Sequence, residues 1–338
     1  MKIKKLNKER NKTKYSNIKK HLAQAGCFCY NLNMQAKTKK RIGVLRGGAG
    51  KQYASSLKKG GEIILHISEN LGDKYKPVDI LIDKNHIWHC GGVPITPGDL
   101  VKKIDIVWNT THPSLSNILD SLSVPTIGAS SFSYALENSK DMLREHIKNI
   151  GVEMPRSIIL PVYQKDFDGP RERYSIKKAK EVFEKFSSPW VVKSFTEDSS
   201  MGIHLAKTFP ELVTAIEDGV NHGKSILVEE FIAGKVASIH SVPKFRGQNI
   251  YTFPLGNTFG NFSAEEKNKL TDLAKDLHSY VGAKHYLKSD FVLSPKGKVY
   301  LLQIRSIPNL KADSHFSQVC ESVGAKMHQV VEHILEQV

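Results

Sequence analysis

The sequence predicts a protein of the α/β and α+β classes, in which a parallel α/β domain is followed by two mixed lobes. The first third alternates apolar, strand-like segments with helical ones, which is typical of a parallel sheet. From residue 157 onward strands dominate, and helices near 176–187, 209–218 and 263–280 lie between them. A chain of 338 residues with 40% apolar content can bury more than one core. We therefore expect two or three domains.

The N-terminal α/β domain is predicted to span residues 40–130. It opens with the strand RIGVLR (41–46), which runs through the turn GGAGK into a helical pattern. VDILID (78–83) and DIVWNT (105–110) are further buried strands, SLSNILDSL is a helix, and PTIG (125–128) closes the sheet. The turn lacks the spacing of a phosphate loop, and Tyr53 stands where a dinucleotide fingerprint has its third glycine. The turn alone therefore predicts no nucleotide site.

A central lobe is predicted over residues 131–232 and a C-terminal lobe over residues 233–338. Apolar residues at helical spacing in 137–151, with Gly151 as a stop, predict one helix there. The central lobe then holds the strands SIILPV, WVVKSF, GIHLAK and SILVEEFI. The C-terminal lobe holds VASIHSV, NIYTFPL, DFVLS and KVYLLQI, and ends in two helices that Gly324 separates.

Most of the net charge of +15 lies at the beginning of the chain. Residues 1–40 contain twelve Lys or Arg and a single acid, Glu9, for a net +11, which leaves +4 for the other 298 residues. Such a near-balance does not resemble a basic nucleic-acid-binding face, so we expect no nucleic-acid partner. Residues 1–39 are predicted to be a disordered leader. Two alternatives stay open for it, a targeting segment and an extension that precedes a true start at Met34.

The expected location is the cytoplasm, without a membrane anchor. No apolar run approaches the roughly 18 to 20 residues that a spanning helix needs. Four cysteines, two of them in the leader, form neither a dense disulfide pattern nor a paired metal motif.

Four later segments carry the chemistry, and they are WVVKSFTEDSSMGI (190–203), ILVEEFIAG (226–234), YLKSDFVL (286–293) and KVYLLQIRSIPNL (298–310). Lys193 lies within an apolar strand, where a charge is costly without an anionic partner. The small, polar loop that follows can turn backbone N–H groups and serine hydroxyls toward phosphate oxygens. An acidic pair with two apolar residues after it offers carboxylates for an amine edge and a surface for a flat base.

The order and spacing of these segments resemble the ATP-grasp superfamily. The flanks resemble D-alanine D-alanine ligases in particular, namely RIGVLRGG, WNTTH, ENSKDMLR and the pattern V-K-x5-S-S-x-G, and the likeness covers roughly residues 41–335. The resemblance implies an ATP-grasp fold, in which a central and a C-terminal lobe clasp ATP. It also implies ATP and Mg²⁺ as cofactors, D-alanine or a similar amino acid as substrate, and a homodimer as the assembly to test.

Carried over residue by residue, the resemblance implies three sets of site residues. ATP would contact Lys140, Lys193, Ser199, Ser200, Gly202, Glu229, Glu230, Phe231 and Ile232. Substrates would contact His112, Ser56 and Ser314, and the catalytic residues would be Lys288, which stands where the family presents an arginine to the oxyanion, His112 and Ser199. Plainer alternatives remain, since Lys140 could be a solvated charge, the acidic pair could alternate on an edge strand, and Phe231 and Ile232 could be core residues.

The metal positions depart from the family pattern. Asp290 matches the aspartate ligand, but Gln303 fills the glutamate position and Arg305 the asparagine position. A glutamine can offer a neutral oxygen, whereas an arginine offers no acceptor. Asp290, with Gln303 as a weak second ligand, is therefore the expected magnesium site. Changes at Gln52, Val236 and Asn309 also depart from the substrate and ribose contacts of the family.

Three functions follow as hypotheses. The first is a ligase in which ATP phosphorylates the carboxylate of one D-alanine, and the amine of a second attacks the acylphosphate to give a dipeptide for peptidoglycan precursors. The second is a nucleotide-binding protein with weakened catalysis, which Gln303 and Arg305 favour. The third is a ligase for another carboxylate and amine, which the short loop FPLGNTFGNF favours.

Overall fold

The computed structural model of the chain describes residues 38–48, 52–195, 201–256 and 260–338. The chain divides into two compact units, Met1–Lys40 and Arg41–Val338. Every helix and strand among the described residues lies in the second unit, apart from the first residue of β1. The prediction of a disordered leader falls almost entirely outside the described residues.

A six-stranded sheet forms the first part of the second unit, with the strand order β4-β3-β2-β1-β5-β6. Its strands are β1 (Lys40–Gly47), β2 (Tyr75–Ile82), β3 (Trp88–Cys90), β4 (Val93–Ile95), β5 (Ile106–Asn109) and β6 (Thr126–Ile127). β1 and β6 both pair in parallel with β5, as the sequence predicted. The edge differs from that prediction, because β3 pairs antiparallel with both β2 and β4. The β3–β4 turn is the pair Gly91–Gly92, whose positive φ values of 60° and 79° suit a tight hairpin.

Helix α2 (Tyr53–Asn70) packs closely against the sheet, and α3 (Ser114–Ser121) follows β5. The buried side of α2 includes Ile63 and Ile67, at the spacing expected of one helical face. Gly60 on the same side permits a close approach, because a Cβ atom there would stand 2.7 Å from the Cβ of Arg46 on β1. A short 3₁₀ turn, η1 (Pro97–Leu100), joins the hairpin to β5.

The single helix predicted over residues 137–151 is instead divided. α4 (Ser131–Asn138) ends before Ser139, and α5 (Lys140–His146) begins after it and runs into η2 (Ile147–Ile150). Ser139 is extended, with φ −131° and ψ 105°, and its hydroxyl accepts a hydrogen bond from the Met142 N–H. Serine favours this capping role over a helix interior, which explains the break. Gly151 stops the segment in the left-handed conformation, with φ 71°, as predicted.

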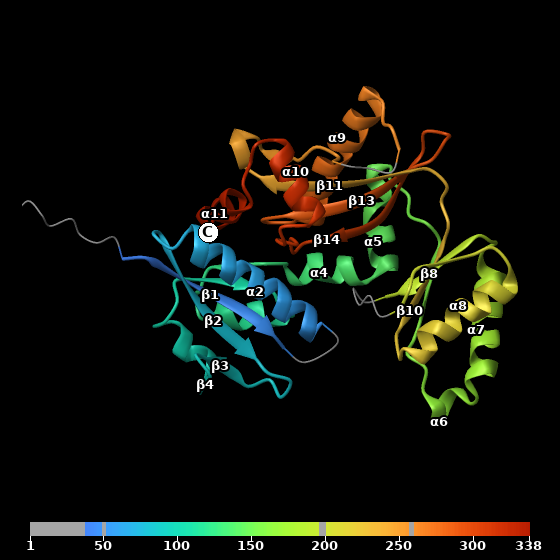
Figure 1. Cartoon of the computed structure of the whole chain (residues 1–338), viewed down its shortest axis with the longest axis horizontal. Helices are drawn as coiled ribbons and strands as arrows, with labels where there is room; N and C mark the ends of the chain where they lie inside the picture. The colour runs from blue at the N-terminus through green and yellow to red at the C-terminus, as the bar shows by residue number, and fades with distance from the viewer. Residues whose placement is uncertain (1–37, 49–51, 196–200, 257–259) are drawn as a thin grey trace, which may run out of the picture. The chain divides into compact units, whose positions relative to one another are not determined.

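The central lobe contains a four-stranded sheet in the order β7-β10-β8-β9, and all of its pairings are antiparallel. The strands are β7 (Ser157–Leu160), β8 (Trp190–Ser194), β9 (His204–Ala206) and β10 (Ile226–Glu230). Helices α7 (Arg171–Lys185) and α8 (Phe209–Asn221) lie beside each other against this sheet, and α6 (Lys165–Asp168) precedes them (Figure 1). Trp190 and Val192 from the sheet share a buried core with Leu212 and Ile216 of α8.

A second antiparallel sheet, in the order β12-β11-β13-β14, forms the C-terminal lobe. It consists of β11 (Lys235–Pro243), β12 (Ile250–Thr252), β13 (Leu287–Leu293) and β14 (Val299–Arg305), with η3 (Phe245–Gly247) before β12. Helix α9 (Ala264–Val281) packs on it and begins with a capping box. The β13–β14 pairing contains a bulge, since Asp290 lies opposite Gln303 but Phe291 lies opposite Leu301. Leu302 is therefore an extra residue in β14.

Two helices end the chain, α10 (His315–Ser322) and α11 (Met327–Glu336), and the predicted break at Gly324 is present with φ 67°. Val330 and Ile334 of α11 belong to the same buried cluster as Ile63 and Ile67 of α2. The end of the chain thus packs against the N-terminal α/β domain. Within the described residues, no helix is both long enough and apolar enough to cross a membrane.

Candidate functional site

Two lysines converge on one buried carboxylate, Glu229. Strands β8 and β10 pair so that Lys193 lies opposite Leu227, which places Lys193 and Glu229 on the same face of the sheet. Lys193 Nζ is 2.7 Å from Glu229 Oε2. Lys140 is the first residue of α5, and its Nζ is 3.1 Å from Glu229 Oε1. We call these three residues the Glu229 cluster.

The Glu229 cluster is shielded from water, and this shapes its charge states. Glu229 is 4% exposed and Lys140 9% exposed. Burial alone would raise the pKa of Glu229, but the two lysines more than offset it and hold that pKa below its ordinary value. Burial lowers the pKa of Lys140, and the nearby charges of Lys193 and Arg305 lower it further, against the attraction of Glu229. The cluster is thus a desolvated group of charges next to further cations.

A backbone carbonyl completes the surroundings of Lys140. Its ammonium group also donates a hydrogen bond to the carbonyl oxygen of Leu302, the bulge residue of β14. The Lys140 side chain therefore joins α5, the central sheet and the C-terminal sheet at one point. The alternative of a solvated surface charge does not hold for this residue.

The neighbouring Glu230 faces the other side of β10. Its carboxylate forms two hydrogen bonds of 3.0 Å with the Arg156 guanidinium. This partner lowers the pKa of Glu230. The acidic pair of the sequence is therefore divided between two faces, and only Glu229 joins the lysines.

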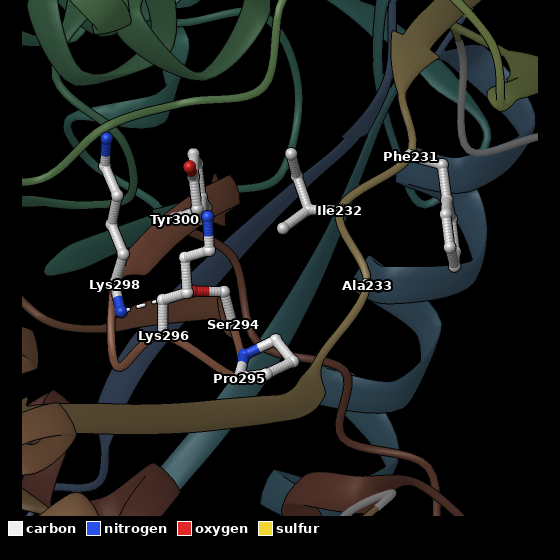
Figure 2. A pocket seen from close by; sticks show the side chains of 8 residues that line it. All are labelled: Phe231, Ile232, Ala233, Ser294, Pro295, Lys296, Lys298 and Tyr300. Carbon is white, nitrogen blue, oxygen red and sulfur yellow. Dashed lines mark hydrogen bonds between the residues drawn. The ribbon is translucent and has the colours of Figure 1, made fainter.

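A cavity of about 290 Å³ begins directly after β10. Phe231, Ile232 and Ala233 line one side of it. The β13–β14 connection and the start of β14 line the other, with Ser294, Pro295, Lys296, Lys298 and Tyr300. Figure 2 shows the two groups of side chains. Phe231 is 40% exposed, so it is not a core residue. Apolar side chains with basic groups at the border suit a flat, anionic ligand.

A second charged group surrounds Asp290 on β13, and we call it the Asp290 cluster. Lys288 Nζ is 3.0 Å from Asp290 Oδ1, Ser238 Oγ on β11 is 2.5 Å from the same oxygen, and the Gln303 amide donates to Oδ2 at 2.7 Å. The bulge in β14 sets Gln303 directly opposite Asp290. Burial would raise the pKa of Asp290, but Lys288 and the two hydrogen bonds bring it below its ordinary value.

Arg305 lies between the two clusters. Its guanidinium is 3.8 Å from Glu137 Oε1 and 3.5 Å from Gln303 Oε1. The other oxygen of Glu137 accepts hydrogen bonds from the Ser306 N–H and hydroxyl. Glu137, at the end of α4, thus fixes the chain just beyond β14.

These residues do not fit the magnesium site that the resemblance implies. Mg²⁺ prefers near-octahedral oxygen ligands, chiefly carboxylates and water. Here one carboxylate, Asp290, and one amide, Gln303, stand beside the cations Lys288 and Arg305. No three His, Cys, Asp or Glu side chains in the described part of the chain are arranged to hold a metal.

The predicted substrate residues lie at the ends of secondary structures. Ser56 is buried near the start of α2, where its hydroxyl accepts from the Gly47 N–H and hydrogen-bonds with Thr110. His112 is exposed, its Nδ1 is 2.8 Å from the Ser114 hydroxyl, and its ring lies edge-on to a tyrosine. Ser314 caps α10 by accepting from the Ser317 N–H.

Ser199 and Ser200 lie outside the described residues, and Gly202 is exposed just after them. The structure therefore brings together Lys140, Lys193 and Glu229, and separately Lys288, Asp290 and Gln303, while the loop serines stay predictions.

Three features of the site were not predicted from the sequence. They are the Glu137 contacts, the Ser238 hydroxyl on Asp290, and a buried string in which His240 hydrogen-bonds with Tyr286 at 2.7 Å and with His315 at 2.8 Å. Burial, His315 and Lys288 lower the pKa of His240 well below its ordinary range, so this imidazole is neutral. Glu137 lies three residues before Lys140, which was the only available signal for it.

Comparisons with known proteins show which family the chain resembles. A family model described as the D-Ala D-Ala ligase C-terminus matches residues 152–242 and 257–336, slightly more than half of the chain. The D-alanine–D-alanine ligase of Azobacteroides pseudotrichonymphae is 25% identical over 338 residues, which cover 88% of this chain and 100% of that protein. The vancomycin/teicoplanin A-type resistance protein of Enterococcus faecium is 21% identical, with 87% of this chain and 97% of that protein covered.

Solved structures show the same fold. The D-Ala:D-Ser ligase from Enterococcus faecalis superposes with a TM-score of 0.66 at 18% identity, covering 89% of this chain and 99% of that one. The D-alanine–D-alanine ligase from Bacillus anthracis complexed with ATP superposes with a TM-score of 0.62 at 19% identity, covering 88% and 96%. At such identities the structural likeness shows the ATP-grasp architecture.

Proposed function

Because this chain belongs to the D-alanine–D-alanine ligase family, we propose that it is an ATP-dependent ligase that joins two amino acids, with D-alanine as the first substrate to test. The observation that carries this proposal is the Glu229 cluster. Lys140 and Lys193 meet at a shielded point between the central and C-terminal sheets. Desolvated ammonium groups placed together attract a polyanion far more strongly than surface lysines do.

The nucleotide would lie across the two lobes. Its phosphates would face Lys140 and Lys193, and the base would enter the cavity beside Phe231 and Ile232. Glu229 would accept a hydrogen bond from an exocyclic amine, since it is the second-last residue of β10 and the cavity begins at Phe231. Glu230 is already paired with Arg156, so we assign it to holding the strand rather than the base.

The chemistry is acyl phosphorylation followed by amine attack. The γ-phosphoryl group passes from ATP to the carboxylate of the first amino acid, and the amine of the second displaces phosphate to form the C–N bond. Lys288 would support the oxyanion of this step, because its ammonium is the cation of the Asp290 cluster and has three N–H donors. In the transition state, fixed cations neutralise the charge that spreads over the transferring oxygens.

The amino-acid substrates would lie toward the N-terminal domain. His112 would orient the first carboxylate from its exposed position after β5. The hydroxyls of Ser56 and Ser314 hold nearby backbone, so these residues would shape the walls of the substrate sites. A cytoplasmic location and a homodimer stay predictions.

A second candidate is nucleotide binding without ligation. The observation that favours it is the occupied Asp290 carboxylate, which leaves the expected metal position without a free anionic ligand. In that case ATP would bind, but no acylphosphate would form. A ligase for a different pair of substrates is the third reading, and product analysis distinguishes all three.

The test is a turnover assay on the full chain. ADP release is measured in excess MgCl₂, with and without D-alanine, and the products are identified by mass spectrometry. A dipeptide that appears together with ADP supports the ligase. ADP release with another amino acid, but not with D-alanine, would mean that the other amino acid is the substrate. ATP binding without any ADP release would identify a nucleotide-binding protein.

A matched pair of variants ties the activity to this site. Lys193→Met removes a cluster lysine, and Lys207→Met removes an exposed lysine that follows β9. The first variant should lose ADP release and the second should keep it. Equal activity of both would place the reaction elsewhere on the chain.

A further inference from the structure

The carboxylate of Asp290 already has three donor groups around it. It is 6% exposed, and it accepts from the Lys288 ammonium, the Ser238 hydroxyl and the Gln303 amide. A divalent cation that binds Oδ1 closely would displace an ammonium group that lies 3.0 Å from that oxygen. Such a displacement would leave Lys288 without its partner in a partly buried place, which is costly.

The Arg305 guanidinium lies near Gln303, which donates to this carboxylate. It has five N–H donors and no acceptor, so it repels a cation and cannot coordinate one. Glu137 and Gln303 limit where it can point, at 3.8 Å and 3.5 Å. The group also lies close enough to Lys140 for the two charges to interact. Arg305 is therefore part of the same field of positive charge as the Glu229 cluster.

Taken together, four side-chain cations lie in or next to the two clusters. Lys140 and Lys193 share Glu229, Lys288 is paired with Asp290, and Arg305 is near Glu137. Phosphoryl groups need their charge neutralised, and a planar guanidinium can bind two phosphate oxygens at once.

We propose that Lys288 and Arg305 neutralise the nucleotide phosphates in place of a protein-held divalent metal, so that this site binds a nucleoside triphosphate without magnesium. The inference rests on the proposed function, because it assumes that a nucleotide binds at the Glu229 cluster. It adds that these two positively charged side chains neutralise phosphate charge, which a bound magnesium ion would otherwise neutralise.

The test is a calorimetric titration of the full chain with ATP, and with its non-hydrolysable β,γ-imido analogue, in excess EDTA and in excess MgCl₂. Binding in EDTA should be within about fivefold of binding in MgCl₂. Arg305→Gln should weaken binding in EDTA by about tenfold or more, because it removes a charge-assisted phosphate contact. The control Arg171→Gln, an exposed arginine at the start of α7, should bind like the unmodified chain.

A restoring variant sharpens the test. Gln303→Glu combined with Arg305→Asn supplies two oxygen ligands and removes the guanidinium. This protein should bind ATP weakly in EDTA and regain affinity in MgCl₂. A thermal melt of each variant shows whether it is folded, and Lys288→Met replaces Arg305→Gln as the probe of the cations if the latter does not fold.

The possible outcomes separate the two proposals. ATP binding that occurs only in MgCl₂ overturns the inference and leaves the nucleotide site in place. Unchanged binding by Arg305→Gln in EDTA also overturns it, since the guanidinium then contributes nothing. If the unmodified chain binds ATP in neither buffer, the proposed function fails, and the inference fails with it.

Discussion

The Glu229 cluster and the Asp290 cluster use a buried carboxylate in the same way but in different settings. Both carboxylates have a lowered pKa because lysines lie beside them. Glu229 pairs with two lysines that come from separate elements, α5 and β8. Asp290 pairs with a lysine only two residues away on its own strand. The first cluster therefore joins parts of the chain, and the second organises the surface of a single sheet. A ligand that draws the lysines away from their carboxylates should therefore loosen contacts between elements at Glu229, but only contacts within one sheet at Asp290.

The largest expected effect comes from removing the carboxylate that joins the elements. Glu229→Gln leaves two lysines without their buried partner, and we expect a loss of about 3 to 5 kcal/mol in the free energy of unfolding. Glu230→Gln is the matched control on the same strand, where an exposed pair with Arg156 predicts a change below about 1 kcal/mol. Chemical denaturation measures both. Similar losses of unfolding free energy for the two variants would mean that the Glu229 cluster stabilises the fold no more than an exposed ion pair does.

Binding should show the next largest effect. Lys193→Met removes a charge-assisted phosphate contact, worth about 2 to 3 kcal/mol, which corresponds to roughly 30- to 150-fold in the Kd for ATP. The fold should persist, because the strand position is otherwise apolar. Titration calorimetry gives the Kd, and a circular dichroism spectrum checks the fold. Unchanged affinity would remove the nucleotide from the Glu229 cluster.

Acid should act on the protein through its histidines before it acts on either cluster. Burial lowers the pKa of His278 and His285 from 6.5 to about 4, so below pH 6.5 the unfolded chain binds protons that the folded chain does not. Stability is then fully present above pH 6.5 and is lost as the pH falls toward 4, by about 1 kcal/mol for each histidine near pH 5.5. Denaturation curves at the two pH values measure the loss. Both carboxylates have lowered pKa values, so their own contribution should be lost only at lower pH.

The His285→Phe variant provides the control for this prediction. It removes one of several histidines whose pKa is lowered, so the loss of stability between pH 6.5 and 5.5 should become smaller by about 1 kcal/mol. An unchanged pH dependence would show that other groups account for the acid sensitivity.

The smallest effect should come from the leader. Deleting residues 1–33 is expected to shift the Tm by less than about 2 °C, because the segment is rich in lysine and has little apolar content. A differential scanning experiment measures the shift. A large drop would mean that the leader packs on the second unit, and the comparison of the two clusters would then have to include it.

Much of the fold could be predicted because hydrophobic periodicity is a local property. The strands around Lys193 and Asp290, the closing helix pair and the stop at Gly151 all follow from patterns within a few residues. The β3–β4 hairpin was missed because its strands are only three residues long. The break at Ser139 was missed because a serine in an otherwise helical pattern does not reveal whether its hydroxyl caps the next helix.

The candidate site was less predictable, since it depends on contacts between distant segments. Lys193 could be singled out from its apolar strand, whereas the importance of Lys140 came only from the resemblance to a known family. Adjacent Glu229 and Glu230 could not be told apart in sequence, and only the strand pairing shows which one faces the lysines. Ser238 and Glu137 meet their partners across 52 and 169 residues, a distance that no local pattern spans.

The bulge at Leu302 shows that part of the site is specified by chain length and not by residue type. Along β14, Val299 and Leu301 are buried, and the next buried residue is Ile304. The extra residue Leu302 is therefore accommodated while Gln303 and Arg305 stay on the face opposite to the buried residues. Its carbonyl group nevertheless receives the Lys140 ammonium. Any residue that adopts the same backbone conformation could occupy position 302 and still present that oxygen, but a chain one residue shorter could not. A comparison of amino-acid identities alone would therefore overlook this contact, and the spacing between the strand and its turn would reveal it.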